Sequence, residues 1–124
     1  MQTLLHYFLH LGFPLLVARL CFRERWWRAY LVLLASMAID LDHLLADPVF
    51  QADRCSVGLH PLHTLPAVVG YGVLLCFRRP YRTLGVGLLL HVLTDLLDCV
   101  MTYRRCPACL ADAPAEALVR SLVG

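Results

Sequence analysis

The chain has 124 residues, of which 60% are hydrophobic and 16% charged, and its mean hydropathy is +0.66. This composition indicates an integral membrane protein rather than a small soluble domain. The formal net charge is only +2, and the positive residues form no basic stripe, which argues against nucleic-acid binding. The length allows one domain.

Four apolar segments approach the ~20 residues that cross a bilayer: residues 3–22, 30–46, 62–77 and 83–101. They predict an all-α fold, a four-transmembrane-helix bundle over residues 1–103. The tail, residues 104–124, has apolar residues at helical spacing and is expected to be either a short interfacial helix or a frayed terminus. The first segment has no basic residues before its apolar run, so we expect a retained anchor and not a signal peptide.

Arginines gather in the loop between the first and second segments and in the loop between the third and fourth. They are Arg23, Arg25, Arg28, Arg78, Arg79 and Arg82. The positive-inside rule places both loops in the cytoplasm. The termini and the loop 47–59 are then expected to face the periplasm or exterior of a bacterial inner membrane.

An offset of 55 residues brings the two halves of the bundle into partial register. The residues 20–23 and 75–78 share the sequence Leu-Cys-Phe-Arg, Asp40 overlays Asp95, and His43 overlays Asp98. This pattern favours two parallel pseudo-repeated hairpins, with a chance match as the alternative.

All six histidines and four of the seven aspartates fall at the same expected end of the four segments. They are His6, His10, Asp40, Asp42, His43, His60, His63, His91, Asp95 and Asp98. An ionisable group in an apolar transmembrane segment costs about 2.5–3.5 kcal/mol, so such a cluster needs a compensating partner. A bound divalent cation would be that partner.

Helical spacing puts the members of each set on shared faces: His6 with His10, Asp40 with His43, and residues 91, 95 and 98 in one stripe. Asp42 would point away from the Asp40 face. It is expected either to turn inward near the helix end or to orient a metal-bound imidazole, and it is the candidate general base.

Each set taken alone has a simpler explanation, such as residues at headgroup level, a polar helix end or a loop flank. Their joint occurrence favours a metal site. Ten donors exceed the four ligands of one tetrahedral zinc, which predicts two or three ions. Nitrogen and oxygen donors without thiolates suit Zn²⁺, with Mn²⁺ or Fe²⁺ as alternatives. Haem binding by paired histidines would leave the aspartates unexplained.

Six cysteines are many for this length. Those on the expected outer side are Cys55, Cys99, Cys106 and Cys109, for which a Cys55–Cys99 or Cys106–Cys109 disulfide, free thiols and a zinc-ligand role all remain open. Cys21 and Cys76 are expected to be small buried apolar residues.

The motifs that carry chemistry are His6-Tyr7-Phe8-Leu9-His10, Asp40-Leu41-Asp42-His43, Arg54-Cys55-Ser56 with His60-Pro61-Leu62-His63, and Gly87 through His91 to Cys99. In this order they resemble a family of small uncharacterised bacterial membrane proteins that is distantly similar to membrane-bound metal-dependent hydrolases. The resemblance implies a four-helix membrane fold and metal-dependent hydrolysis. The chain departs from the wider group at residues 60–64, where an arginine-containing histidine motif is expected, so no substrate class is carried over.

The expected function is therefore hydrolysis of a lipid or lipid-linked ester or phosphoester at the outer leaflet. The expected partners are membrane lipids and a lipid-like substrate, and the oligomeric state is left open. The alternative is a metal- or proton-handling transporter or a metal-binding protein. A transporter would need polar residues continuing to the cytoplasmic face, and residues 13–30 and 70–90 offer almost none within the spans.

Overall fold

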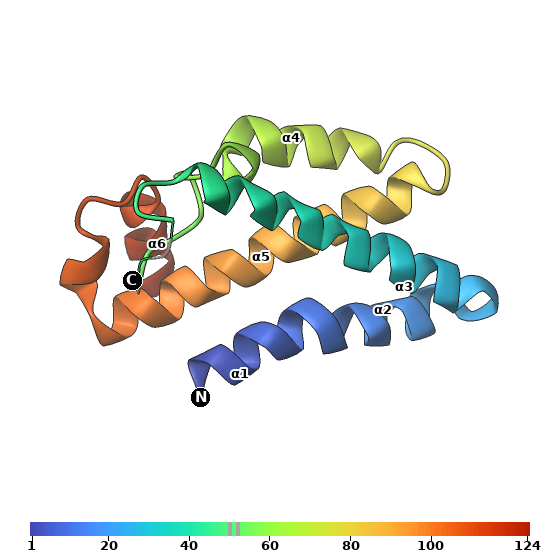
Figure 1. The fold of residues 1–124 in the computed structure, drawn as a ribbon, viewed down its shortest axis with the longest axis horizontal. Coiled ribbons are helices and arrows are strands. Elements are labelled where there is room, and N and C mark those ends of the chain that lie inside the picture. The colour runs from blue at the N-terminus through green and yellow to red at the C-terminus, as the bar shows by residue number, and fades with distance from the viewer. Residues whose placement is uncertain (50, 52) are drawn as a thin grey trace.

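The computed structural model describes residues 1–49, 51 and 53–124, and in that part of the chain it contains helices and no β-strand (Figure 1). The all-α prediction is confirmed. The α-helices are α1 (Gln2–Tyr7), α2 (Phe13–Cys21), α3 (Trp26–Ala35), α4 (Leu65–Leu74), α5 (Tyr81–Arg105) and α6 (Glu116–Val123). A π-helical turn, Phe8–Gly12, joins α1 to α2, and 3₁₀ segments cover Arg23–Arg25, Ser36–Leu45, Pro61–His63 and Pro107–Leu110.

The helices form two hairpins whose turns lie at the same end of the molecule (Figure 1). One turn joins α2 to α3 and the other joins α4 to α5, so the two arginine-rich loops lie together. The N-terminus, α6 and the segment that leads into α4 lie at the opposite end. Both arginine-rich loops thus lie at one end of the molecule, and the side of a membrane that this end faces stays a prediction.

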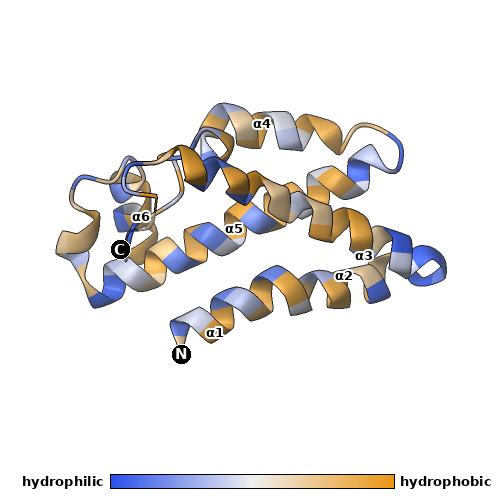
Figure 2. Cartoon of the chain, viewed as in Figure 1, coloured by the Kyte–Doolittle hydropathy of each residue, from blue (hydrophilic) through white to orange (hydrophobic). Residues whose placement is uncertain are grey.

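Two helical segments, Gln2–Cys21 and Tyr81–Arg105, are long and apolar enough to cross a membrane, whereas the apolar helix Leu65–Leu74 is shorter. Length and composition of this kind also occur in buried core helices. Hydrophobic residues make up much of the helices, and hydrophilic residues gather at the two ends of the molecule and recur along α5 (Figure 2). The large exposed apolar side chains include Leu4, Leu16, Leu20, Leu65, Val69 and Leu93.

Helix α5 is central and contacts α1, α3, α4 and α6. Two glycines allow close approach. A Cβ on Gly85 would lie 2.8 Å from Leu74 Cβ of α4, and one on Gly87 would lie 2.8 Å from Ser36 Oγ. Small residues let helix backbones approach closely, as in membrane bundles, so α5 packs closely against α4 and against the 3₁₀ segment Ser36–Leu45, which carries Asp40, Asp42 and His43.

Two of the four apolar segments expected from the sequence differ from the observed helices in type or in extent. The second is α-helical only to Ala35 and then continues as a 3₁₀-helix over Ser36–Leu45. The third is helical over Leu65–Leu74 and not over 62–77. Here Thr64 is extended and Pro66 occupies the first turn, which is the position that proline favours; the preceding prolyl turn, Pro61–His63, is separate.

The C-terminal tail folds back onto α5. Leu110 and Val119 are fully buried, and with Ala115 they form a core with Cys55 and Cys99. The tail is thus a packed element and not a frayed terminus.

The structure contains two disulfides, Cys55–Cys99 and Cys106–Cys109. The zinc-ligand and free-thiol alternatives for these four residues are wrong. Cys21 and Cys76 are free thiols. They are exposed and not buried as expected, because they lie at the ends of their helices beside the arginine loops.

Candidate metal centre

Three groups of side chains place their potential ligand atoms within 4.8 Å of one another. They are Asp40–His63–His91–Asp95, His6–His10–Asp95 and Asp42–His43–His60. Nine of the ten residues predicted from the sequence therefore come together, from α1, the π-helical turn, the 3₁₀ segment Ser36–Leu45, the loop before α4, and α5.

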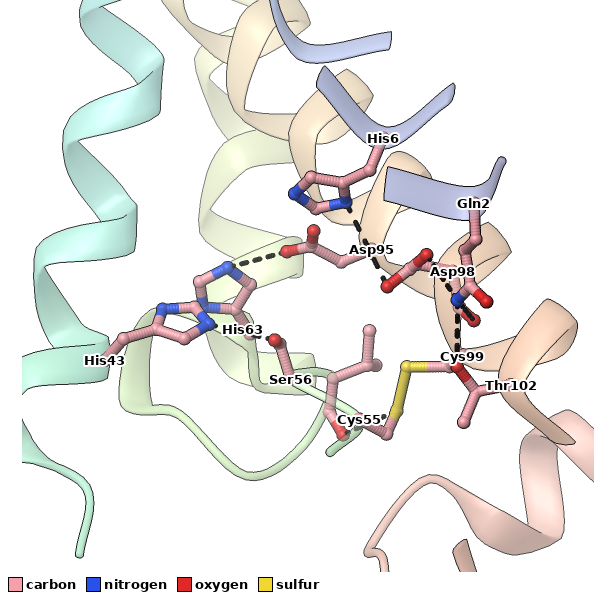
Figure 3. The surroundings of a disulfide bond; sticks show 11 residues. Gln2, His6, His43, Cys55, Ser56, His63, Asp95, Asp98, Cys99 and Thr102 are labelled. Atoms are coloured by element: carbon pink, nitrogen blue, oxygen red, sulfur yellow. Dashed lines mark hydrogen bonds and ion pairs between the residues drawn. A yellow bond between two sulfur atoms is a disulfide. The ribbon is translucent and has the colours of Figure 1, made fainter. Parts of the chain in front are cut away.

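In the first group, each of the two histidines lies close to both aspartates. His91 Nε2 lies 3.1 Å from Asp40 Oδ1 and 3.4 Å from Asp95 Oδ2. His63 Nε2 lies 3.0 Å from the same Asp95 oxygen and 3.9 Å from Asp40 Oδ1 (Figure 3). The side chains of both histidines are completely buried.

The second group uses the other oxygen of Asp95, whose Oδ1 lies 3.4 Å from His10 Nε2. The rings of His6 and His10 are 4.3 Å apart, as expected for residues four apart on a helix. His10 lies in the π-helical turn. Pro14 explains this turn, because proline has no N–H to donate to the carbonyl of residue 10 and so interrupts the α-helical hydrogen bonds.

The third group forms around Asp42. Its Oδ1 lies 3.2 Å from His43 Nδ1, and the rings of His43 and His60 are 3.9 Å apart. The two imidazoles and the buried carboxylate offer the mixed nitrogen and oxygen donors that a divalent metal accepts.

Asp42 also connects the third group to the first. Its Oδ2 accepts the backbone N–H of Leu62 at 2.9 Å and lies 3.2 Å from His63 Nδ1. Asp42 therefore turns inward and at the same time orients an imidazole, which unites the two roles expected for it. Its side chain is 3% exposed, whereas that of Asp40 is 46% exposed.

Several buried donor and acceptor atoms in these groups form no hydrogen bond of good geometry among the described residues, although most of them lie 3.0–3.4 Å from a side chain that could pair with them. They include His10 Nε2, Asp42 Oδ1, His60 Nε2, His63 Nε2 and Asp95 Oδ2. Leaving such a group unpaired costs about 1–3 kcal/mol. Nitrogen and carboxylate atoms that converge in this way fit a bound divalent cation, which would pair with several of them at once.

The Cys55–Cys99 disulfide holds the loop of the third group against α5 (Figure 3). Cys99 lies one helical turn beyond Asp95, so the bridge brings the loop residues His60 and His63 to α5. Next to Cys55, Ser56 Oγ lies 2.9 Å from His43 Nε2. Ser56 stands in one of the motifs that carry the family resemblance, but it was not among the predicted site residues, because nothing in the spacing of the sequence pairs it with His43.

Asp98 is the predicted ligand that lies outside the three groups. Its Oδ1 accepts a hydrogen bond of 2.7 Å from the amide of Gln2, which also donates to Thr102 Oγ1 at 3.0 Å (Figure 3). Asp98 Oδ2 lies 4.0 Å from His6 Nδ1. At this distance the two side chains form no hydrogen bond. Asp98 is held instead by Gln2, a residue that the sequence did not reveal.

A polar cavity of about 370 Å³ adjoins the second group through His6. Its lining comprises Gln2, Thr3, His6, Tyr7, Gln51, Asp53, Arg54, Asp98, Thr102 and Arg105. Arg105 pairs with Asp53, and Arg54 donates to the carbonyls of Pro48 and Val49. The cavity therefore carries both charges next to the metal-binding candidates.

No curated protein and no solved structure shows significant similarity to the chain. A family model does match, and it covers residues 1–102, a range that holds all ten residues predicted to bind metal. The chain therefore belongs to this family, DUF6122, a family of unknown function.

Proposed function

We propose that this protein is a membrane-embedded hydrolase that uses two or three divalent metal ions to cleave a lipid or lipid-linked ester or phosphoester. The observation that carries the proposal is the position of Asp95. One carboxylate oxygen faces His10 and the other faces His63 and His91. A carboxylate that contributes to two ligand groups suits a centre with more than one ion, the type of site that many hydrolases use.

The donor set favours zinc. Imidazole nitrogens and carboxylate oxygens make up all three groups, and the four outer cysteines are engaged in disulfides. Zn²⁺ suits such ligands, and Mn²⁺ and Fe²⁺ are the alternatives. When bound, these ions supply Lewis-acid activation of water and of the carbonyl or phosphoryl group under attack.

The chain's own residues orient the site and move the proton. Asp42 Oδ2 accepts from His63 Nδ1, which leaves His63 Nε2 directed at Asp95. A carboxylate in this position fixes the tautomer and the orientation of an imidazole ligand. Asp42 Oδ1 is buried 3.2 Å from His43 Nδ1 and forms no hydrogen bond of good geometry with it, and we assign this oxygen as the general base.

A lipid-like substrate fits the surroundings of the site. The polar cavity beside His6 would receive a polar headgroup, and exposed leucines on α1, such as Leu4, would face the acyl chains. Placement in the bacterial inner membrane, with the site and both termini outward, is part of the proposal.

An apolar core separates the site from the arginine loops, which favours hydrolysis over transport. Ala18, Ala29 and Leu33 are buried there, and Phe22 and Val86 pack against them. A transporter of metal ions or protons would need a polar path through this region.

The test is to strip the purified protein with a chelator, reload it with Zn²⁺, Mn²⁺ or Fe²⁺, and assay hydrolysis of lipid esters and phosphoesters in mixed micelles. We expect metal-dependent release of product, lost in Asp95→Asn. Asp47→Asn, an exposed aspartate outside the groups, should retain activity. A metal-loaded protein that cleaves none of the substrates but moves zinc across vesicle membranes would instead support the transport alternative.

A further inference from the structure

A second cavity, of about 250 Å³, lies at the arginine end of the molecule, away from the candidate metal centre. Three arginines line it together with smaller and apolar residues. The lining is Phe22, Arg25, Arg28, Ala29, Val32, Arg79, Pro80 and Thr83. The arginines come from both hairpin turns, so the cavity exists only where the two hairpins meet.

These arginines form no salt bridge within the described residues, although Glu24 lies beside them in the same turn. In that part of the chain the one arginine–carboxylate pair is Arg105–Asp53, at the other end of the molecule. The Arg79 guanidinium lies 4.8 Å from the centre of the Phe22 ring, a contact that fixes its position without cancelling its charge. The cavity is therefore bounded by three arginines, Arg25, Arg28 and Arg79, that carry no salt bridge.

An apolar groove of about 330 Å³ continues from this cavity. Leu31, Val32, Ala35, Pro80, Tyr81 and Leu84 line it, and Val32 and Pro80 line both spaces. Leu31 and Ala35 lie about two and three helical turns beyond Arg25 along α3. The groove therefore leads from the charged cavity toward the middle of the helices, between α3 and α5.

We propose that the cavity and groove together bind an anionic phospholipid, with its phosphate between Arg25, Arg28 and Arg79 and an acyl chain along Leu31 and Leu84. Basic pockets between helices on the cytoplasmic side recognise anionic headgroups. A free phosphate would use the arginines but would leave the groove unfilled. The inference rests on the membrane placement in the proposed function and is independent of hydrolysis.

The two tryptophans of the chain, Trp26 and Trp27, directly follow Arg25 and give a local readout. Purified protein in detergent is titrated with phosphatidylglycerol or phosphatidylcholine that carries bromine on an acyl chain, which quenches nearby tryptophan emission. We expect saturable quenching at lower concentration for phosphatidylglycerol. An arginine that faces the bound headgroup contributes about fivefold to such binding, so Arg25→Gln with Arg79→Gln should raise the midpoint about 25-fold.

Matched variants separate the two parts of the site. Arg78→Gln removes the same charge from the same turn at an exposed position outside the cavity lining and should leave the midpoint unchanged. Ala35→Phe fills the groove and should raise the midpoint, whereas Ala38→Phe, exposed but outside the groove lining, should not.

Equal midpoints for the two lipids, or an unchanged midpoint in the double arginine variant, would overturn the proposal. Displacement of phosphatidylglycerol by millimolar inorganic phosphate would also overturn it, since the site would then be one for free anions. If lipid binding fails while the same preparation loads metal and hydrolyses substrate, only this inference is lost. A protein that does not partition into membranes would contradict both proposals.

Discussion

Replacing Asp95 by asparagine perturbs the candidate metal centre at the residue that its first and second groups share. The substitution keeps the shape of the side chain and removes its charge. The His6–His10 pair then keeps no carboxylate, whereas the first group still has Asp40, His63 and His91. The two groups should therefore respond unequally, with the second losing its ion and the first holding its ion more weakly.

The magnitude follows from the contacts. Removing a residue that only orients a metal ligand weakens metal binding about 10–100-fold. Asp95 faces three imidazoles at 3.0–3.4 Å, so its loss should cost at least the upper value, which corresponds to about 3 kcal/mol per ion. The bound metal should fall by at least one equivalent per chain.

The assay is elemental analysis of the purified variant after dialysis against a weak chelator, with a competition titration for affinity. Asp98→Asn is the matched control, because Asp98 lies about one turn further on α5 and outside the three groups. It should retain most of its metal. The reasoning is refuted if Asp95→Asn binds as much metal as the unaltered protein, or if Asp98→Asn loses more.

The remaining predictions concern other parts of the centre and the topology. Asp42→Asn should keep metal bound but lower turnover by about 10²–10⁴ if Asp42 is the base, measured as turnover beside metal content; loss of the metal itself would make Asp42 a ligand. Cys55→Ser should lower the free energy of unfolding by about 4 kcal/mol, because the lost disulfide closes a loop with a sequence separation of 44. Cys106→Ser should lower it by only about 2 kcal/mol, because that disulfide spans a separation of 3. Equal losses of unfolding free energy in chemical denaturation would contradict this reasoning. Reporter fusions should place both termini outside the cytoplasm, and a cytoplasmic C-terminus would overturn the topology.

The sequence identified the candidate ligand residues because helical spacing depends only on local order. His6 with His10, and His91 with Asp95, were expected on shared faces, and each pair joins a group. Asp40 and His43 also lie on one side of their segment, although it is a 3₁₀-helix, because residues three apart align in that helix as well.

The contacts between elements could not be predicted in this way. The contact between Asp42 and His63 depends on how the loop before α4 folds over the 3₁₀ segment. The hydrogen bond that holds Asp98 comes from Gln2, 96 residues away in the sequence. The disulfide pairing was left open because spacing alone does not decide it. One missed feature did have a local signal: Pro14, four residues after His10, interrupts the helix there.

The shortness of α4 sets the depth at which chemistry would take place. Ten residues give a helix of about 15 Å, half the ~30 Å hydrocarbon thickness of a bilayer. In a membrane α4 would therefore be a half-span, and the irregular chain before it, with His60 and His63, would descend below the headgroups as a re-entrant segment. Backbone of this kind is tolerated at such depth only when protein buries it or water reaches it. His60 and His63 are 2% and 1% exposed, and the tail core around Leu110 and Val119 packs against the same loop at Cys55. Water would then reach the site from the outer aqueous side and the lipid substrate would enter sideways between the helices. The lipid would not have to leave its leaflet.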